Sequence, residues 1–301
     1  MSPSPEIHNV GFSRNGFPHK YARFDAPDAE QVVAKLRSSA CGGGSVTIPH
    51  KETLLPRMDS LSEAAKVIGA VNTITKSADG KLHGDNTDWL GIKNQLESRL
   101  GSVPKSRGTC PFNIKSKLGS MFGAASAAPK TPGLTCLLCG SGGTARAAAF
   151  AFKQMGASRV IIYNRTTSRA KALAEEFGFE VCEDLGRLAE LPELHVVVNT
   201  LPGSTGFQLP DAAVLRRHRP VVLEAAYIPR RTAFVQQALA AGCEIVEGVE
   251  MLFEQGCAQC EIWTGASAPR SDIAAALLQT LFTRGSPHPA HGKMEPYDAL
   301  P

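Results

Sequence analysis

The segment 140–145, Gly-Ser-Gly-Gly-Thr-Ala, has the glycine spacing of a turn that holds phosphate. A strand-like apolar run, 134–139, precedes it, and a helical run, 145–155, follows it. In this order the glycines let a pyrophosphate approach the N–H groups at a helix N-terminus. The segment therefore predicts dinucleotide binding. Because left-handed turns in general favour glycine, a purely structural strand–helix turn is the alternative.

A basic cluster after the next predicted strand, 159–163, indicates which dinucleotide is bound. NAD-binding proteins keep an acidic residue about 20 positions past the glycines, where it binds the ribose hydroxyls. Here Asn164 and Arg165 occupy that place, Thr166 follows, and Arg169 lies one helical turn further on. Such a cluster attracts a phosphate on the ribose 2′-oxygen, so we predict NADP(H) rather than NAD(H). Exposed arginines without a ligand are the alternative.

A lysine and an aspartate in the first hundred residues have the chemistry that a hydride donor needs beside it. Lys51 follows the predicted strand 45–48, Asp88 lies in the first turn of a predicted helix, 87–100, and Asn72 adds an amide on another strand. A lysine beside a carboxylate holds both a proton and a charge at neutral pH, so the pair can supply or remove a hydroxyl proton. We predict that Lys51 and Asp88 are the catalytic pair. The alternative is a solvated lysine and a carboxylate that a helix N-terminus favours.

Size and composition are those of a two-domain globular protein. The chain has 301 residues, of which 43% are apolar and 20% charged, and its net charge is +4. This charge is too small to favour nucleic acid or a membrane as a partner, and no apolar run reaches the ~18–20 residues that span a bilayer. The first residues lack the basic and apolar regions of a signal peptide. We therefore expect a cytoplasmic protein with a small-molecule partner.

The eight cysteines are expected to be reduced thiols that fill apolar positions. Two pairs have Cys-x-x-Cys spacing, Cys136 with Cys139 and Cys257 with Cys260, but no further Cys/His pair lies at zinc-finger spacing. We expect no metal, with a zinc site as the weaker alternative. Cys136 and Cys139 lie three apart on a predicted strand and should face opposite sides of it.

Alternating helices and strands predict an α/β fold with two domains. Residues 1–100 form the first domain, 133–248 form a Rossmann-like dinucleotide-binding domain, 101–132 is a linker or insertion, and 285–301 is a disordered tail. The first domain is expected to hold helices at 4–15, 29–38, 52–59 and 62–67, strands at 21–24 and 45–48, and a hairpin at 70–84. Ser4 is the expected N-cap of the first helix. Further strands are expected at 180–182, 195–199, 221–225 and 244–246, and two closing helices at 249–264 and 271–284.

At this point the motifs, in order and at their spacings, resemble the shikimate dehydrogenase family over about residues 2–284. They comprise Ser-x-Ser-Pro-x-x-His-Asn from Ser2, Val-Thr-Ile-Pro-x-Lys from Val46, Gly-Ala-Val-Asn-Thr from Gly69, Asn-Thr-Asp from Asn86, the segments 140–145 and 164–166, Tyr227-x-Pro229, Gly248 and Gln255-Gly256. Residues 42–49 and 263–265 look most like the shikimate dehydrogenase domain that ends the arom-type pentafunctional polypeptide. A larger multi-domain polypeptide is therefore one expected setting for this chain.

The resemblance implies NADP-dependent, reversible reduction of 3-dehydroshikimate to shikimate in aromatic amino-acid biosynthesis. It also implies an N-terminal substrate-binding α/β domain, a Rossmann-like NADP-binding domain, and C-terminal helices, 249–284, that pack back on the first domain. Lys51 and Asp88 would manage the proton at the ring carbonyl. Substrate would be held by Ser2, Ser4, Thr47, Asn72, Tyr227 and Gln255, with Asp88 also in contact. Cofactor would be held by Gly140, Gly142, Gly143, Thr144, Ala145, Asn164, Arg165, Thr166, Arg169 and Gly248.

The chain departs from the family pattern at its start. Family members begin with a strand inside the first sheet that ends in a glycine–proline turn before the first serine, whereas here Met1 directly precedes Ser2. Three expectations follow: a chain cut from a longer polypeptide, a true start upstream, or an impaired first domain. Loss of an interior strand would leave backbone groups unpaired and would weaken substrate binding more than cofactor binding.

Two other functions fit parts of the pattern. Quinate or quinate/shikimate dehydrogenases have a similar site and several prefer NAD, against which Arg165 argues. Dehydrogenase-like domains also occur in quinate-pathway repressors, where ligand sensing replaces turnover. The intact Lys51, Asp88 and Gln255 argue against a repressor, whereas the missing first strand argues for one.

Overall fold

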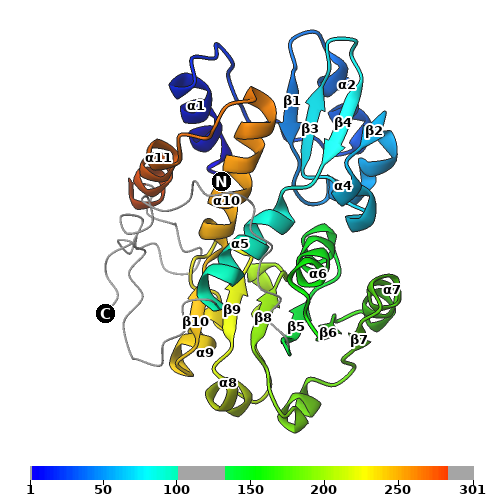
Figure 1. Ribbon diagram of the computed structural model, residues 1–301, viewed down its shortest axis with the longest axis vertical. Helices are drawn as coiled ribbons and strands as arrows, with labels where there is room; N and C mark the ends of the chain where they lie inside the picture. Colours follow the sequence, from blue (N-terminus) through cyan, green and yellow to red (C-terminus); the bar gives the residue numbers. More distant parts are fainter. Residues whose placement is uncertain (1, 101–132, 284–301) are drawn as a thin grey trace.

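The computed structural model describes residues 2–100 and 133–283, so the predicted linker 101–132 and tail 285–301 lie outside the described residues. The described chain forms two lobes, each built around its own sheet, with long helices between and beside them (Figure 1). The expected α/β fold class is confirmed.

The first lobe contains a four-stranded sheet of order β1-β3-β4-β2. Its strands are β1 (Gly43–Ser45), β2 (Ser60–Leu61), β3 (Thr73–Lys76) and β4 (Leu82–Asp85). Strands β3 and β4 form the expected antiparallel hairpin, and Gly80 in its turn has φ +82°, a conformation that favours glycine. The helices of this lobe are α2 (Ala29–Arg37), α3 (His50–Thr53), the 3₁₀ turn η1 (Leu55–Arg57) and α4 (Glu63–Ile68).

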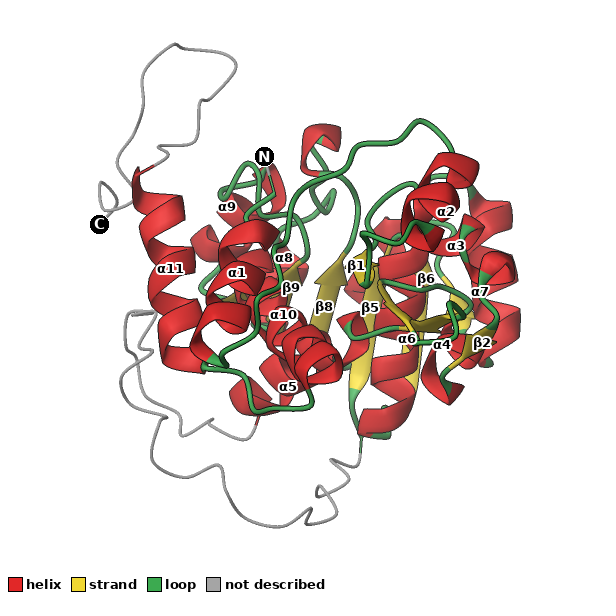
Figure 2. Cartoon of the chain, turned by 90° about the horizontal axis from the view of Figure 1, so that it is seen from above, coloured by secondary structure: helices red, strands yellow, loops and turns green. Residues whose placement is uncertain are grey.

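The second lobe is a parallel six-stranded sheet of order β10-β9-β8-β5-β6-β7. Its strands are β5 (Thr135–Cys139), β6 (Arg159–Tyr163), β7 (Glu180–Val181), β8 (Val196–Asn199), β9 (Val221–Glu224) and β10 (Glu244–Val246). Its helices are α6 (Gly143–Met155), α7 (Thr167–Phe177), η3 (Leu185–Glu190), η4 (Gly203–Thr205), α8 (Ala213–His218) and α9 (Ala233–Ala240). Helices lie on both faces of the sheet (Figure 2). Strand order reverses between β5 and β8, and ligands of such sheets bind at that reversal, beyond the carboxyl ends of the strands.

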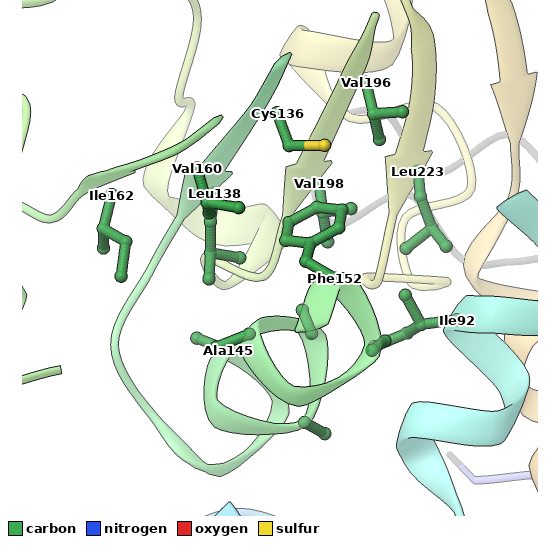
Figure 3. Close-up of a cluster of buried hydrophobic side chains, with 14 of the residues drawn as sticks. Ile92, Cys136, Leu138, Ala145, Phe152, Val160, Ile162, Val196, Val198 and Leu223 are labelled. Atoms are coloured by element: carbon green, nitrogen blue, oxygen red, sulfur yellow. The ribbon is translucent and has the colours of Figure 1, made fainter. Parts of the chain in front are cut away.

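The apolar strands of the second lobe bury both faces of its sheet. On one face, Phe152 of α6 packs against side chains of the central strands, among them Leu138 and Val198 (Figure 3). Cys136 lies in this cluster, whereas Cys139 lies in the cluster on the opposite face. The prediction that the two thiols face opposite sides is therefore confirmed. It follows from the period of two along a strand.

Four further helices pack against one another beside the sheets: α1 (Ser4–Arg14), α5 (Asp88–Leu100), α10 (Gly248–Thr264) and α11 (Arg270–Thr283). Helix α5 packs its Ile92 and Leu96 into the core of the second lobe, although its first turn adjoins the first sheet. Helices α10 and α11 pack against α1 through a cluster that includes Ile7, Cys257 and Ile273. The C-terminal helices therefore pack back on the N-terminal part of the chain, as expected.

The predicted strand at 21–24 is wrong, because that segment belongs to no sheet. The backbone of Tyr21 bonds a side chain of α1 instead of a strand. The Asn9 side-chain amide donates to Tyr21 O at 3.0 Å, and Tyr21 N donates to Asn9 Oδ1 at 2.7 Å. Among the described strands, β1 pairs only with β3 and so lies at the edge of its sheet.

Three predicted element boundaries are also wrong. Helix α1 begins at Ser4 with Pro3 as the N-cap, so Ser4 is not the cap. Strand β1 ends at Ser45 rather than at residue 48, because the chain leaves the sheet after Val46 N donates to Asn72 O at 2.7 Å. The helix expected at 52–59 begins two residues earlier as α3, which therefore contains Lys51, and continues as a short 3₁₀ turn after residue 54.

Candidate active site

Lys51 and Asp88 form a buried ion pair. Lys51 Nζ lies 2.5 Å from Asp88 Oδ2, and the two residues are 8% and 4% exposed. Lys51 comes from α3, whereas Asp88 is the first residue of α5, where the helix dipole favours a carboxylate. Removing charges from water is costly, so such a pair persists only where further hydrogen bonds satisfy its remaining atoms.

Asn72 supplies one of those hydrogen bonds and connects the pair to its surroundings. Its Nδ2 lies 2.9 Å from Asp88 Oδ1 and 3.2 Å from Gln255 Oε1. Its Oδ1 accepts from Thr87 N at 2.7 Å and from the Thr73 hydroxyl at 2.7 Å. Because both ends of the amide have partners, Asn72 is held in one orientation, and it fixes the Asp88 carboxylate with it.

Helix α10 brings two glutamines to the same place. Gln255 contacts Asn72, and Gln259, one turn later and 0% exposed, donates to Asn72 O at 3.1 Å and to Thr73 Oγ1 at 3.0 Å. Gln259 also accepts from the Ser45 hydroxyl at 2.8 Å. Gln259 was not among the predicted site residues. Its spacing of four from Gln255 places both on one helix face, and this was the signal that could have identified it.

Two further residues of the network were not predicted as site residues. Asn86 Oδ1 accepts from Asp88 N at 3.0 Å, and Asn86 Nδ2 donates to Ala70 O at 2.9 Å. The Thr87 hydroxyl lies 3.2 Å from Gln255 O and 3.1 Å from Asn72 Nδ2. Both residues stand directly before Asp88 in the Asn-Thr-Asp motif, and their adjacency was the available signal.

The structure brings some of the other predicted substrate-binding residues together. The Ser2 and Ser4 hydroxyls lie 2.9 Å apart, and Ser4 N donates to Ser2 Oγ at 3.3 Å, so the two hydroxyls form one polar group at the start of α1. Thr47 is exposed after β1, and Tyr227 is half-buried in the loop after β9. Within the described residues, neither Thr47 nor Tyr227 has a side-chain hydrogen bond to Lys51, Asp88 or Asn72.

The glycine turn leads from β5 into the N-terminus of α6, at the reversal of strand order. Gly140 has φ +120°, and a Cβ there would collide with the Thr200 hydroxyl, which follows β8. Gly142 is the N-cap of α6 and has no side chain to cover the helix end. The first N–H groups of α6 lack intrahelical partners, so this end offers donors to a phosphate. The turn therefore fits a pyrophosphate.

The predicted basic cluster, Asn164 to Arg169, lies on the turn between β6 and α7 and in the first turn of α7. Asn164 Nδ2 donates to Thr166 O at 3.0 Å, and Thr166 is the N-cap of α7. Arg165 and Arg169 are both exposed, and no carboxylate of the described residues is paired with either. Two guanidinium groups, one on the turn before α7 and one in its first turn, fit a phosphate monoester.

Gly248 is the first residue of α10 and is buried. A Cβ there would lie 2.6 Å from Ala225 O and 2.8 Å from Ala226 O, so glycine lets α10 begin directly against the loop that carries Tyr227. The same loop is tied to Glu224, which is 1% exposed. The Glu224 carboxylate accepts from Ala226 N at 3.0 Å and from the Asn199 and Thr232 side chains, each at 2.9 Å. Burial raises the pKa of Glu224, whereas these three donors oppose the shift.

The described cysteines are buried or half-buried, and burial raises the pKa of the Cys257 thiol to about 12. In the described part of the chain, no group of three or more His, Cys, Asp or Glu residues could hold a metal ion. No helix within 2–100 and 133–283 is long and apolar enough to cross a membrane.

Three family models match the chain. They are the shikimate dehydrogenase substrate binding domain at residues 1–74, the shikimate / quinate 5-dehydrogenase model at 124–209, and the shikimate 5′-dehydrogenase C-terminal domain at 248–278. The chain belongs to the shikimate dehydrogenase family. The matched ranges contain both the Lys51 segment and the glycine turn.

Relatives and solved structures agree with this membership. The pentafunctional AROM polypeptide of Eremothecium gossypii is 37% identical over 296 residues, which are 92% of this chain and 17% of that polypeptide. Shikimate 5-dehydrogenase from Thermus thermophilus, solved in complex with NADP(H) and shikimate, is 28% identical with a TM-score of 0.73 and covers 93% of this chain and 95% of its own. The dehydroquinate dehydratase and shikimate dehydrogenase of S. pombe AroM is 29% identical, with a TM-score of 0.69, over 92% of this chain and 51% of its own.

Proposed function

We propose that this chain is an NADP-dependent shikimate dehydrogenase that reversibly reduces 3-dehydroshikimate to shikimate. One observation carries the proposal. The Lys51 ammonium contacts Asp88 in the first lobe and lies 3.1 Å from the Thr144 hydroxyl in the first turn of α6. A proton-transfer pair and a phosphate-binding turn therefore meet in one place, as a hydride transfer that is coupled to a proton requires.

In this mechanism Lys51 and Asp88 hold the proton at the ring oxygen. When bound, NADPH supplies the hydride to the ring carbonyl carbon. The Lys51 ammonium transfers one proton to the carbonyl oxygen and becomes a neutral amine, and the Asp88 carboxylate stabilises the positive charge before transfer and stays hydrogen-bonded to the amine afterwards. In the reverse direction the same pair removes the hydroxyl proton. Asn72 keeps the Asp88 carboxylate oriented throughout, because its amide bonds Oδ1 and leaves Oδ2 to Lys51.

The substrate is a small hydroxylated ring with a carboxylate. Two hydroxyl donors at the start of α1, Ser2 and Ser4, suit the carboxylate, whereas Asn72 and Gln255 offer amide groups to ring hydroxyls. Thr47 and Tyr227 complete the predicted set from the segments after β1 and β9. The 28% identical Thermus enzyme, whose complex contains shikimate and NADP(H), supports this choice of substrate.

The arginines favour NADP(H) over NAD(H). Arg165 and Arg169 present positive charge where a 2′-phosphate needs it.

The chain spans 17% of the length of the AROM polypeptide of Eremothecium gossypii, so we propose that it provides the shikimate dehydrogenase step, either alone or as one part of a larger enzyme.

The test is a steady-state assay of the purified protein with shikimate or quinate and NADP or NAD. We expect oxidation of shikimate with NADP, a far lower rate with NAD, and loss of at least about 100-fold in kcat for Lys51→Ala, because general acid–base groups contribute about 10²–10⁴-fold. Preference for quinate would identify a quinate dehydrogenase, and binding without turnover would identify a sensor. An unchanged rate in Lys51→Ala would refute the mechanism.

A further inference from the structure

The first turn of α6 contacts the catalytic lysine directly. The Thr144 hydroxyl oxygen accepts from Lys51 Nζ at 3.1 Å. A Cβ on the preceding Gly143 would lie 2.9 Å from Lys51 Cβ and 3.3 Å from Ala70 Cβ. The absence of a side chain at Gly143 therefore brings the helix end close enough for the next residue, Thr144, to reach the ammonium group.

The contact restrains a group that would otherwise be free to move. Lysine carries its ammonium on a four-carbon stem with several rotatable bonds. A single hydrogen bond to Asp88 Oδ2 fixes the distance between the two groups but lets the nitrogen swing around that oxygen. A second acceptor from the other lobe, Thr144, restricts this motion. Of the three N–H groups of the ammonium, two are then directed to protein and one is left for substrate.

We propose that Thr144 is a positioning residue that holds the Lys51 ammonium in its reactive position, in addition to any contact of its backbone with the cofactor. The proposal rests on the proposed function for its kinetic consequences. The two contacts use different atoms: the Thr144 side-chain oxygen accepts from Lys51, whereas a phosphate would bind the backbone N–H groups at the helix start, which no capping side chain covers. A variant that removes only the hydroxyl therefore separates the positioning role from cofactor binding.

The experiment compares Thr144→Val, which keeps the shape and removes the hydroxyl, with Thr144→Ser, which keeps the hydroxyl. The matched control is Thr53→Val, an exposed threonine on α3 beside the lysine. We expect kcat to fall about tenfold in Thr144→Val, with the Kd of NADP from fluorescence titration within about twofold of wild type. Most of the lost rate should return in Thr144→Ser. The tenfold loss is the low end for a hydrogen bond to a charged group.

A second readout needs no turnover. Competitive acetylation followed by peptide mass spectrometry measures the reactivity of the Lys51 amine relative to the exposed Lys81. We expect that reactivity to change at least threefold in Thr144→Val and to return to the wild-type value in Thr144→Ser. Thr144→Ala replaces Thr144→Val if the valine variant does not fold, as judged by its thermal transition.

Three results would overturn the proposal: wild-type reactivity of Lys51 in Thr144→Val, a serine variant as impaired as the valine variant, or a loss of rate that a weaker Kd for NADP fully accounts for. If the wild-type protein lacks turnover, the proposed function fails. The acetylation result then still decides whether Thr144 holds Lys51.

Discussion

Arg165 and Arg169 lie at an exposed turn, so their charges cost little in the absence of a ligand and are available to one. A 2′-phosphate that binds there forms charge-assisted hydrogen bonds, for which each partner contributes about 1.5–3 kcal/mol. The adenosine ribose of NADH lacks this phosphate. The preference for NADPH over NADH should therefore depend on these side chains more than on the glycine turn, which is predicted to contact the pyrophosphate that both cofactors share.

Arg165→Ala should weaken NADPH binding by roughly 10–150-fold and leave NADH binding nearly unchanged. Titration of protein fluorescence with each cofactor measures both constants. Arg216→Ala, which removes an exposed arginine from α8, is the control and should change neither. Equal losses for NADPH and NADH in the Arg165 variant would mean that this side chain does not hold the phosphate.

The burial of His8 makes the free energy of unfolding depend on pH. Its ring is completely buried among aromatic residues, with Tyr21 and Trp263 ring centroids 4.6 and 4.8 Å away. Burial lowers the pKa of His8 from 6.5 to about 4, and its hydrogen bond to Gln259 opposes the shift only in part. The unfolded chain therefore binds a proton at a higher pH than the folded chain. The contribution of the neutral His8 ring to the free energy of unfolding is therefore fully present above pH 6.5, and it is lost as the pH falls toward 4.

Between pH 7.5 and pH 5, the free energy of unfolding should fall by about 2 kcal/mol through His8 alone. Urea denaturation at several pH values measures this slope. His8→Gln should be less stable than wild type at about pH 7.5 but should lose less stability on acidification. Parallel pH profiles for the two proteins would show that His8 does not cause the dependence.

At the scale of elements, the close packing of α5 on α10 decides whether Thr87, directly before α5, meets Gln255 of α10. Gly91, one turn into α5, would place a Cβ 2.7 Å from Met251 O, which is a backbone atom that cannot move aside. Gly256 on α10 would instead place a Cβ 3.0 Å from Ile7 Cγ2, the end of a side chain. Both glycines let helices approach closely, but only Gly91 is opposed by main chain.

Gly91→Ala should therefore destabilise the protein by about 1–3 kcal/mol, even though alanine is the better helix former by about 1 kcal/mol. It should also lower kcat, because α5 must shift and carries Asp88 with it. Gly256→Ala should cost less stability, because the Ile7 side chain can adjust. Denaturant midpoints of the two variants give the comparison, and a Gly91→Ala protein as stable as wild type would contradict this account of the helix contact.

At the scale of the whole molecule, the site exists only where the two lobes touch. The first turn of α6 is attached to the first lobe at two points. Thr144 contacts Lys51, and the Arg146 guanidinium bonds Ile68 O at the end of α4 while pairing with Glu176 of α7. Gly69, with φ +70°, leaves the space that Arg146 fills. The helix whose N-terminus is predicted to bind phosphate therefore also joins the two lobes.

Several features were predictable from the sequence alone because they depend on neighbours along the chain. The glycine turn, the α/β alternation of the second lobe and the hairpin at β3 and β4 each follow from local spacing and turn chemistry. Lys51 and Asp88 were identified because each stands at the end of a strand or the start of a helix, where sites of α/β proteins gather.

Only the tertiary structure decided the contacts between distant segments. Asn72 meets Gln255 and Gln259 across more than 180 positions of sequence, and Thr144 meets Lys51 across 93. The segment 21–24 has aromatic residues at both ends, as a strand can have, yet the backbone of Tyr21 bonds the Asn9 side chain and the segment joins no sheet. Local residue types set what each segment can form, whereas packing and the pairing of backbone donors determine which partner it finds.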